Sequence, residues 1–195
     1  MYSKYLADHH YKIVNFKKGD IIYAPGSHPR YVYFVKSGEI RMFTLSNEGK
    51  EFTQGVFKSK QYFGEPALLL QRPYLAYTVA LKDSALILLD QQQFEKLIED
   101  NKEFSMSLIK ALSERLFYKS MMLEELANEH ADHRLSTLIN YLCKDLQAGE
   151  VLDITRQALA DRSGLRVETV IRTMKKMADQ NEIKLIRGKI VKQEI

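Results

Sequence analysis

One stretch near the C-terminus limits the possible folds of this chain more than any other part of it. Thr155 is a good N-cap for a helix over residues 156–162, and Ser163 and Gly164 break that helix before a second one over residues 166–178. Short helices joined by a tight turn are the local signature of a helix-turn-helix. The stretch therefore predicts a small helical domain built around this motif.

The packing requirements of the motif are largely met. Leu159 and Val170 can point inward, and Ala160 is small where the two helices approach each other. Ser163 departs from the pattern, because an apolar residue is more usual at that position. The motif is therefore expected to form, with Ser163 as its irregular position.

The residues after the second helix predict a hairpin with basic residues on both arms. Residues 183–186 and 189–192 are strand-like and flank Arg187 and Gly188. A basic hairpin in this place is the wing of a winged helix-turn-helix, and Arg187 is a candidate contact to DNA. We assign residues 131–195 to this DNA-binding domain.

The outer face of the second helix carries the side-chain types that a DNA major groove requires. An arginine can donate two hydrogen bonds to guanine O6 and N7, a glutamate can accept one from cytosine N4, and lysines neutralise phosphates. The alternative is a helix pair with a solvated charged face, and the turn, the spacing and the wing together argue against it. The candidate contacts on this helix are Arg166, Glu168, Thr169, Arg172, Lys175 and Lys176.

The excess positive charge of the chain lies at the same end. Residues 1–150 contain 19 lysines and arginines and 19 aspartates and glutamates, whereas residues 151–195 contain 10 and 6. The last stretch thus supplies the whole formal net charge of +4. An anionic partner is expected there, and double-stranded DNA fits both the charge and the motif.

The first half of the chain is rich in short strand-like runs. They lie between turn signals at glycine, proline, asparagine and aspartate, and include residues 21–23, 31–35, 40–45 and 85–89. Many short strands with regular turns predict a small antiparallel roll or sandwich. We assign residues 1–97 to this domain.

Between these parts the hydrophobic pattern changes to a helical period. From about Gln91 to Asn128 there is no proline or glycine, which predicts one long helix. A narrow apolar seam at heptad spacing favours a parallel dimer coiled coil, and the alternative is a helix that lies on its own core. We assign residues 98–130 to this dimerisation helix and its hinge. The seam residues are Ile109, Leu112, Leu116, Leu123 and Leu126, with Lys119 at one inward position.

Several classes of protein are disfavoured by what the sequence lacks. No run approaches the roughly 18 apolar residues of a membrane span, and the first residues are not an apolar signal core, so we expect a cytoplasmic protein without membrane contact. No P-loop, nucleophile elbow, zinc-protease or Rossmann glycine pattern occurs, which argues against an enzyme.

The single cysteine, Cys143, cannot form an internal disulfide, and its apolar-periodic surroundings predict a buried structural thiol.

The sequence resembles the Crp/Fnr superfamily of transcription regulators from roughly Phe16 to Val191. The resemblance implies an α+β fold with an N-terminal antiparallel β-roll of the cyclic-nucleotide-binding type, a long dimerisation helix and a C-terminal winged helix-turn-helix. It also implies a homodimer that binds palindromic promoter DNA and recruits or blocks RNA polymerase. The matching segments are residues 16–22, 35–40, 63–65, 155–157 and 167–172.

The resemblance assigns roles within the recognition helix. In related proteins the glutamate and arginine that correspond to Glu168 and Arg172 read a G·C pair of a TGA core, and Arg156 lies in a matching segment. Val167 stands where the cyclic-AMP receptor subgroup has another base-reading arginine. Because valine offers only apolar contact to a thymine methyl, half-sites nearer TTGA than TGTGA are expected.

The resemblance covers the effector pocket only in part. Gly64 and Glu65 match the start of the phosphate-binding cassette, in which the glutamate accepts a hydrogen bond from the ribose hydroxyl. The position of the phosphate-pairing arginine falls on Tyr74 and that of its serine partner on Leu75, while Arg72 is two residues away. A cyclic phosphate would therefore lack its bidentate counter-ion, which argues against cyclic AMP as the effector.

Lys119 and Ser120 lie about where relatives of the cyclic-AMP type contact the base. One interpretation is that Lys119 leaves the seam toward solvent or sets the helix register. Another is that it meets an anionic effector or pairs with an acid such as Glu65. The alternative function is thus a cyclic-nucleotide-responsive regulator in which Arg72 or Lys119 replaces the missing arginine. DNA binding without any effector is a further alternative.

No metal or other cofactor is expected. One cysteine cannot supply the four-cysteine iron–sulfur site of oxygen-sensing relatives. The five histidines show no zinc-like cluster, and a solvated hinge explains His130 and His133 better than a metal does. A rival to the DNA-binding regulator is a stand-alone nucleotide sensor that acts through protein partners, against which the recognition helix and wing argue.

Overall fold

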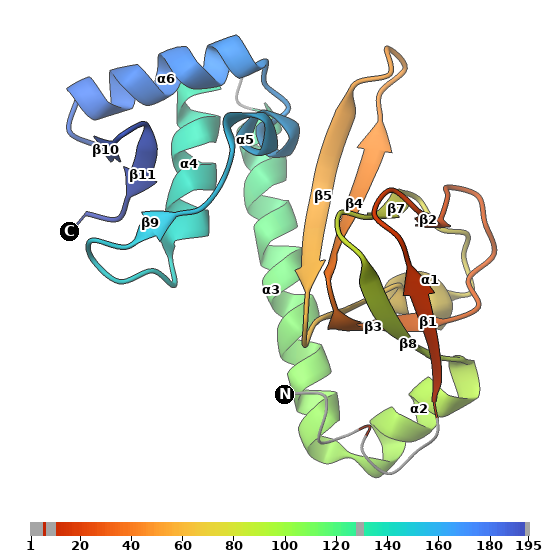
Figure 1. The fold of residues 1–195 in the computed structure, drawn as a ribbon. Helices are drawn as coiled ribbons and strands as arrows, with labels where there is room; N and C mark the ends of the chain where they lie inside the picture. The colour runs from red at the N-terminus through yellow and green to blue at the C-terminus, as the bar shows by residue number, and fades with distance from the viewer. Residues whose placement is uncertain (1–5, 7–10, 128–130, 194–195) are drawn as a thin grey trace. The chain divides into compact units, whose positions relative to one another are not determined.

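The computed structural model describes most of the chain, namely residue 6 and residues 11–127 and 131–193. His130, one of the two hinge histidines, lies outside these ranges. The chain forms two compact units, Met1–Ser113 and Glu114–Ile195. One long helix, α3 (Lys102–Ala127), contributes its first part to one unit and its second part to the other (Figure 1). None of the described helices is long and apolar enough to cross a membrane.

The N-terminal unit contains antiparallel four-stranded sheets ordered β1-β8-β3-β6 and β2-β7-β4-β5. The strands of the first sheet are β1 (Lys12–Phe16), β8 (Ser84–Leu89), β3 (Val32–Ser37) and β6 (Tyr62–Phe63). Those of the second sheet are β2 (Ile21–Tyr23), β7 (Tyr77–Ala80), β4 (Glu39–Leu45) and β5 (Glu51–Lys58). The predicted antiparallel β-roll is confirmed, and so are the strands expected near residues 21–23, 31–35, 40–45 and 85–89.

Strand β3 alternates between two hydrophobic cores. Tyr33 and Val35 join the core between the two sheets, while Val32 and Phe34 join a core shared with the helices that follow the roll. All four side chains are buried. Residues 32–35 of this strand are therefore covered on both faces, which explains why they form a continuous apolar run.

The single helix predicted from about Gln91 to Asn128 is wrong, because the described part of this stretch forms two helices. The first, α2 (Gln91–Asp100), ends before Asn101, whose backbone is extended. The Asn101 side chain accepts a hydrogen bond from the Phe104 amide at 2.9 Å at the start of α3. An asparagine side chain, rather than a proline or glycine, therefore divides the predicted helix.

The helix-turn-helix prediction is confirmed in the C-terminal unit. The Thr155 hydroxyl accepts a hydrogen bond from the Ala158 amide at 3.1 Å, and Gly164 ends the first helix of the motif in a left-handed conformation. The helices of this unit after α3 are α4 (Ala131–Cys143), α5 (Arg156–Ser163) and α6 (Val167–Asp179).

Helices α4, α5 and α6 share one core, in which Leu138, Leu159 and Val170 are almost fully buried. Ser163, the irregular position of the motif, is also buried, and its hydroxyl donates a hydrogen bond to the Leu159 carbonyl at 2.7 Å. A buried hydroxyl is tolerated when it has a hydrogen-bond partner. A bond within its own helix thus lets serine replace an apolar residue here.

The predicted wing is confirmed as the hairpin of β10 (Lys184–Ile186) and β11 (Lys189–Val191). A short strand, β9 (Val151–Leu152), pairs with β11 and completes a three-stranded sheet. Strand β9 could not be predicted from the sequence, because two residues carry no detectable hydrophobic period. The base of the wing is also held by the Gly149 amide, which donates to the Lys192 carbonyl at 2.9 Å.

Candidate nucleic-acid interface

Helix α6 has one buried face and one exposed face. Its buried residues recur every three or four positions, as one side of a helix requires, and are Val170, Thr173, Met174 and Met177. The candidate DNA contacts on the helix and at its N-cap are exposed at Arg166, Glu168, Arg172, Lys175 and Lys176. The exposed face can therefore reach phosphates and base edges while the buried face fixes the helix on its domain.

Two other candidate contacts, Val167 and Thr169, are half-buried. Val167 is the first residue of α6 and packs partly against the core of the domain. Its side chain is therefore held in place by apolar neighbours and leaves only part of its surface for a base.

Ile171 is a residue of the exposed face that the sequence analysis did not select. It lies one helical turn after Val167 and is 38% exposed, although it is a large apolar residue. An apolar side chain on a DNA-reading face can contact a thymine methyl. Its position three residues after Glu168 was the signal that could have found it.

The ammonium of Lys176 forms an ion pair with Asp132, an acid in the first turn of α4. The Thr173 hydroxyl donates to the same carboxylate at 3.0 Å. Hydrogen bonds from Lys176 and Thr173, together with the nearby positive charge of Arg172, hold the pKa of the Asp132 carboxyl below its usual value. Of the predicted phosphate contacts, Lys176 is thus already engaged by an anion of the protein itself.

The tip of the wing is the turn of Arg187 and Gly188. Both residues have positive backbone φ angles, 49° for Arg187 and 78° for Gly188, and Arg187 is exposed. Positive φ at both central residues matches a type I′ turn, which suits the twist of a two-residue hairpin. The turn therefore presents an arginine at the end of the wing.

Arg156, the first residue of α5, is half-buried and does not point freely into solvent. Its guanidinium donates a hydrogen bond of 2.6 Å to the carbonyl of Gly188. The side chain predicted to contact DNA therefore also links the helix-turn-helix to the tip of the wing.

The end of α3 is joined to the start of α4 through a buried acid, Glu125. Its carboxylate accepts hydrogen bonds from Nδ1 of His133 at 3.0 Å and from the Thr137 hydroxyl at 2.8 Å. Burial acts to raise the pKa of Glu125, but the bonds from His133 and Thr137 outweigh it and leave this pKa below its ordinary value. His133 thus serves a contact between helices, and its predicted hinge partner His130 lies outside the described residues.

Comparison with known proteins matches two parts of the chain to families: residues 13–101 to the cyclic nucleotide-binding domain and residues 133–194 to the Crp-like helix-turn-helix domain. The global nitrogen regulator of Nostoc is 26% identical over 186 residues, which cover 91% of this chain and 83% of that protein. The cyclic AMP receptor protein of Thermus thermophilus is 28% identical over 176 residues, covering 90% and 81%. The chain belongs to the Crp/Fnr superfamily.

A solved structure shows the same fold. A CooA variant from Carboxydothermus hydrogenoformans superposes with a TM-score of 0.81 at 20% identity, over 97% of this chain and 89% of that one. This structure confirms the predicted fold class, and the family matches and relatives confirm the predicted resemblance. The protein is a DNA-binding transcription regulator and not an enzyme, in keeping with its relatives.

In this Crp/Fnr regulator, the position expected for a phosphate-pairing arginine holds a buried tyrosine. The Tyr74 ring stacks on Tyr23 with centroids 3.6 Å apart and an interplanar angle of 7°, and its hydroxyl donates to the Tyr31 carbonyl at 3.2 Å. Burial raises the pKa of Tyr74 to about 12, so its hydroxyl is neutral at physiological pH. This side chain is part of the roll's core and brings no positive charge.

The other candidate pocket residues of the roll differ widely in exposure. Glu65 is fully buried at the start of α1 (Glu65–Leu70), after Gly64 with a φ of 91°. Leu75, by contrast, is 85% exposed, and Arg72 is also exposed. The buried acid of the cassette is therefore present, while Arg72 and Leu75, on either side of the position expected for the arginine, face solvent.

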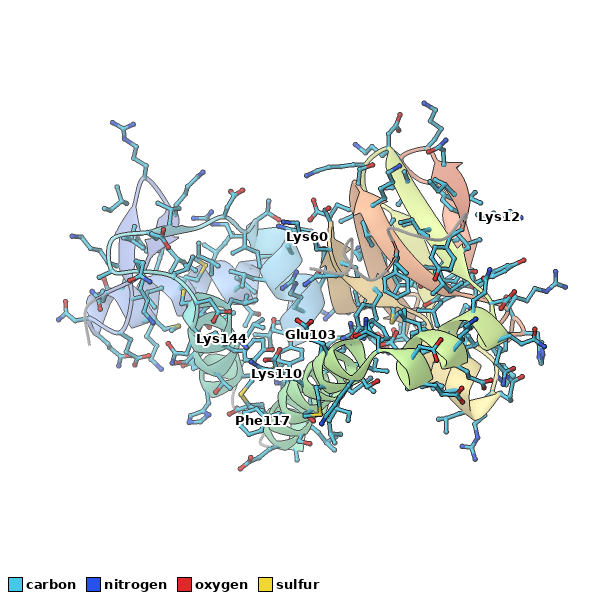
Figure 2. All side chains as sticks on the ribbon, turned by 90° about the horizontal axis from the view of Figure 1, so that it is seen from below. Lys12, Lys60, Glu103, Lys110, Phe117 and Lys144 are labelled. Atoms are coloured by element: carbon cyan, nitrogen blue, oxygen red, sulfur yellow. The ribbon has the colours of Figure 1, made fainter. Side chains whose placement is uncertain are left out.

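The apolar seam of α3 is largely uncovered in the single chain. Among the predicted seam residues, Leu112 is half-buried and packs against the core of the N-terminal unit, whereas the others are exposed. Phe117, which sequence analysis did not select, is 70% exposed on the same helix (Figure 2). Lys119 and Ser120 are exposed too. The exposed seam residues are Ile109 at 55%, Leu116 at 67%, Leu123 at 69% and Leu126 at 43%.

Proposed function

We propose that this regulator works in the cytoplasm as a homodimer that binds palindromic promoter sites with TTGA-type half-sites and there contacts RNA polymerase. One observation carries the proposal: Glu168 and Arg172 lie one helical turn apart on the exposed face of α6. At that spacing the arginine can donate to guanine O6 and N7 while the glutamate accepts from cytosine N4. Val167 adds only an apolar surface, which suits the methyl group of thymine.

The exposed seam of α3 supports the homodimer. Large apolar side chains that are more than half exposed, such as Leu116 and Leu123, are unfavourable in water and favour association. Their heptad spacing suits a second copy of the same helix. A palindromic site then follows, because a two-fold dimer presents its recognition helices symmetrically.

The contacts of Tyr74 support an effector other than cyclic AMP, or none. A cyclic phosphate bound in the roll needs a cation, and the residue at the expected position is a neutral ring with its own partners. Moving Tyr74 out of the core would break its stack with Tyr23 and its hydrogen bond to Tyr31. DNA binding is therefore expected to proceed without a cyclic nucleotide.

The deciding experiment is fluorescence anisotropy with a TTGA palindrome and a matched TGTGA palindrome, with and without cyclic AMP, at several salt concentrations. We expect tighter binding to the TTGA site, no change with cyclic AMP, and an affinity that falls steeply with salt. A preference for TGTGA would contradict the half-site. Binding that requires cyclic AMP would contradict the effector proposal and point to Arg72 or Lys119 as the replacement cation.

The homodimer has its own test by analytical ultracentrifugation. Leu123→Glu places a charge in the exposed seam and should shift the protein toward monomer. Lys110→Glu is the matched control, because Lys110 is exposed on the same helix outside the predicted seam (Figure 2). An unchanged oligomeric state in Leu123→Glu would contradict a dimer built on α3.

A further inference from the structure

The wing tip holds an arginine in a conformation that arginine rarely adopts. Arg187 has a φ of 49°, in the left-handed region that glycine and asparagine tolerate best. Position 187 is the first central residue of a turn that most often carries asparagine, aspartate or glycine. Asparagine or glycine would form this turn with less strain. An exposed arginine in this conformation therefore suggests that its side chain has a role of its own.

The Arg156 guanidinium lies directly against the second residue of this turn. Besides the 2.6 Å bond to the Gly188 carbonyl, its Nη2 atom would lie 2.9 Å from a Cβ atom built on Gly188. No side chain fits at position 188 unless Arg156 moves, and Gly188 also has a positive φ of 78°. The glycine thus leaves room at the tip for the end of the Arg156 side chain.

The backbone attachments of the wing lie toward its base, and one ion pair, between Lys189 and Asp153 at 3.8 Å, lies next to the turn. Strand β9 pairs with β11 at Ile190 and Val191, and the Gly149 and Lys192 backbones are bonded beyond that pairing. The bond from Arg156 joins the tip itself to α5, across 32 residues of sequence. This bond therefore helps to fix the direction in which the turn projects from the domain.

We propose that Arg156 is a positioning residue for DNA binding, which holds the wing tip against α5 so that Arg187 meets a backbone phosphate. This inference rests on the proposed role of Arg187 as a DNA contact. It differs from the prediction that Arg156 is simply one more phosphate contact, because it makes the contribution of Arg156 depend on Arg187.

Chemistry separates the two roles of Arg156. A phosphate needs only a positive charge, which lysine also supplies. The bond to the Gly188 carbonyl comes from Nη2 at the end of the longer arginine side chain, and a compact ammonium on a shorter, flexible stem does not reproduce that position. Arg156→Lys should therefore bind DNA like Arg156→Gln if Arg156 positions the wing, and like the unaltered protein if it binds phosphate directly.

The experiment is a double-mutant cycle on the full chain, with the TTGA palindrome and a series of salt concentrations. The variants are Arg156→Gln, Arg156→Lys, Arg187→Gln and the double variant Arg156→Gln/Arg187→Gln. Each lost phosphate contact lowers the slope of log K against log salt by about 0.9, and each change occurs twice in a homodimer. We expect each single glutamine variant and the double variant to lower the slope by the same amount, about 2. A second cycle pairs Arg156→Gln with Lys175→Gln on α6 and should be additive.

Hydrogen exchange of the wing amides without DNA provides a second readout. Arg156→Gln and Arg156→Lys should both speed exchange at residues 186–189, and Arg187→Gln should not. Additive losses in the first cycle, or full affinity in Arg156→Lys, would overturn the positioning role. An Arg187→Gln variant that binds DNA normally would overturn the proposed contact of Arg187, and the positioning role with it. Unaltered wing exchange in Arg156→Gln overturns the positioning role alone.

Discussion

The two ends of this regulator use their buried and exposed positions in opposite ways. On α6 the charged side chains face solvent and the apolar ones face the core, so the surface offered to DNA is set by residues spaced along one helix. In the β-roll the position expected to hold a charge toward a ligand is filled by Tyr74, which packs inward on Tyr23. A surface that offers charge to a partner can thus follow from residue spacing along one helix, whereas the charge expected inside the roll is absent because one inward position holds a tyrosine.

The strongest test of this contrast concerns the core of the roll. Tyr74→Ala removes an aromatic stack and a buried hydrogen bond and should lower the free energy of unfolding by about 3 to 5 kcal/mol. Urea unfolding followed by tyrosine fluorescence measures it. Tyr74→Phe keeps the ring and should cost only about 1 kcal/mol. A Tyr74→Ala protein with unaltered stability would mean that this side chain does not fill the roll.

A second prediction concerns the recognition helix. Arg172→Ala should weaken binding to the preferred site by about 1 to 3 kcal/mol per half-site and reduce discrimination at the G·C pair, without lowering stability. Anisotropy with the preferred duplex and single-base variants measures both. Lys175→Ala is the matched control, since loss of an exposed lysine should weaken binding to all sequences equally. Retained discrimination in Arg172→Ala would contradict base reading by this side chain.

The joint between α3 and α4 gives a smaller, pH-dependent effect. The pKa of Glu125 lies below its ordinary value of 4.5 when the protein is folded. Its carboxylate therefore adds stability above about pH 4.5, and this contribution is lost as pH falls through the lower, folded-state pKa. Thermal unfolding between about pH 6 and pH 3 should show the loss, and Glu125→Gln should reduce it, at a cost of about 1 kcal/mol near neutral pH. Equal pH profiles for the two proteins would contradict this role.

A weaker effect is expected at the DNA-facing surface of α6. Asp132→Asn removes the carboxylate that pairs with Lys176 and lies near Arg172. Binding to non-specific duplex should tighten by less than about 1 kcal/mol, because partly exposed ion pairs contribute little, and the salt slope should rise. Asp179→Asn, an exposed acid at the end of α6, is the control. Weaker non-specific binding in Asp132→Asn would show that the carboxylate acts mainly through Thr173.

The parts of the structure that could be predicted from the sequence are those whose causes are local. The Thr155 cap, the Gly164 turn and the face of α6 each follow from residues within one or two helical turns. The contact of Asp132 with Lys176 joins residues 44 positions apart, and that of Arg156 with Gly188 joins residues 32 apart, so no spacing rule reveals them. They depend on tertiary packing.

The roll shows the same limit. Its antiparallel architecture followed from short apolar runs and turns, but the stack of Tyr23 on Tyr74 depends on two segments that meet only in the folded protein. The division of the predicted long helix at Asn101 was missed for another reason. A side-chain cap can restart a helix without any residue that forbids one, so the pattern of apolar residues continued across the break.

The left-handed turn and the proposed DNA contact favour different residues at position 187. Asparagine or glycine would relieve roughly 1 kcal/mol of backbone strain there, so a library screened only for heat resistance should replace the arginine. A library screened for promoter occupancy should keep it. On the proposed role of Arg187, the wing tip gives up some folding stability for a contact to DNA, and variants of position 187 should divide into two groups according to the screen applied.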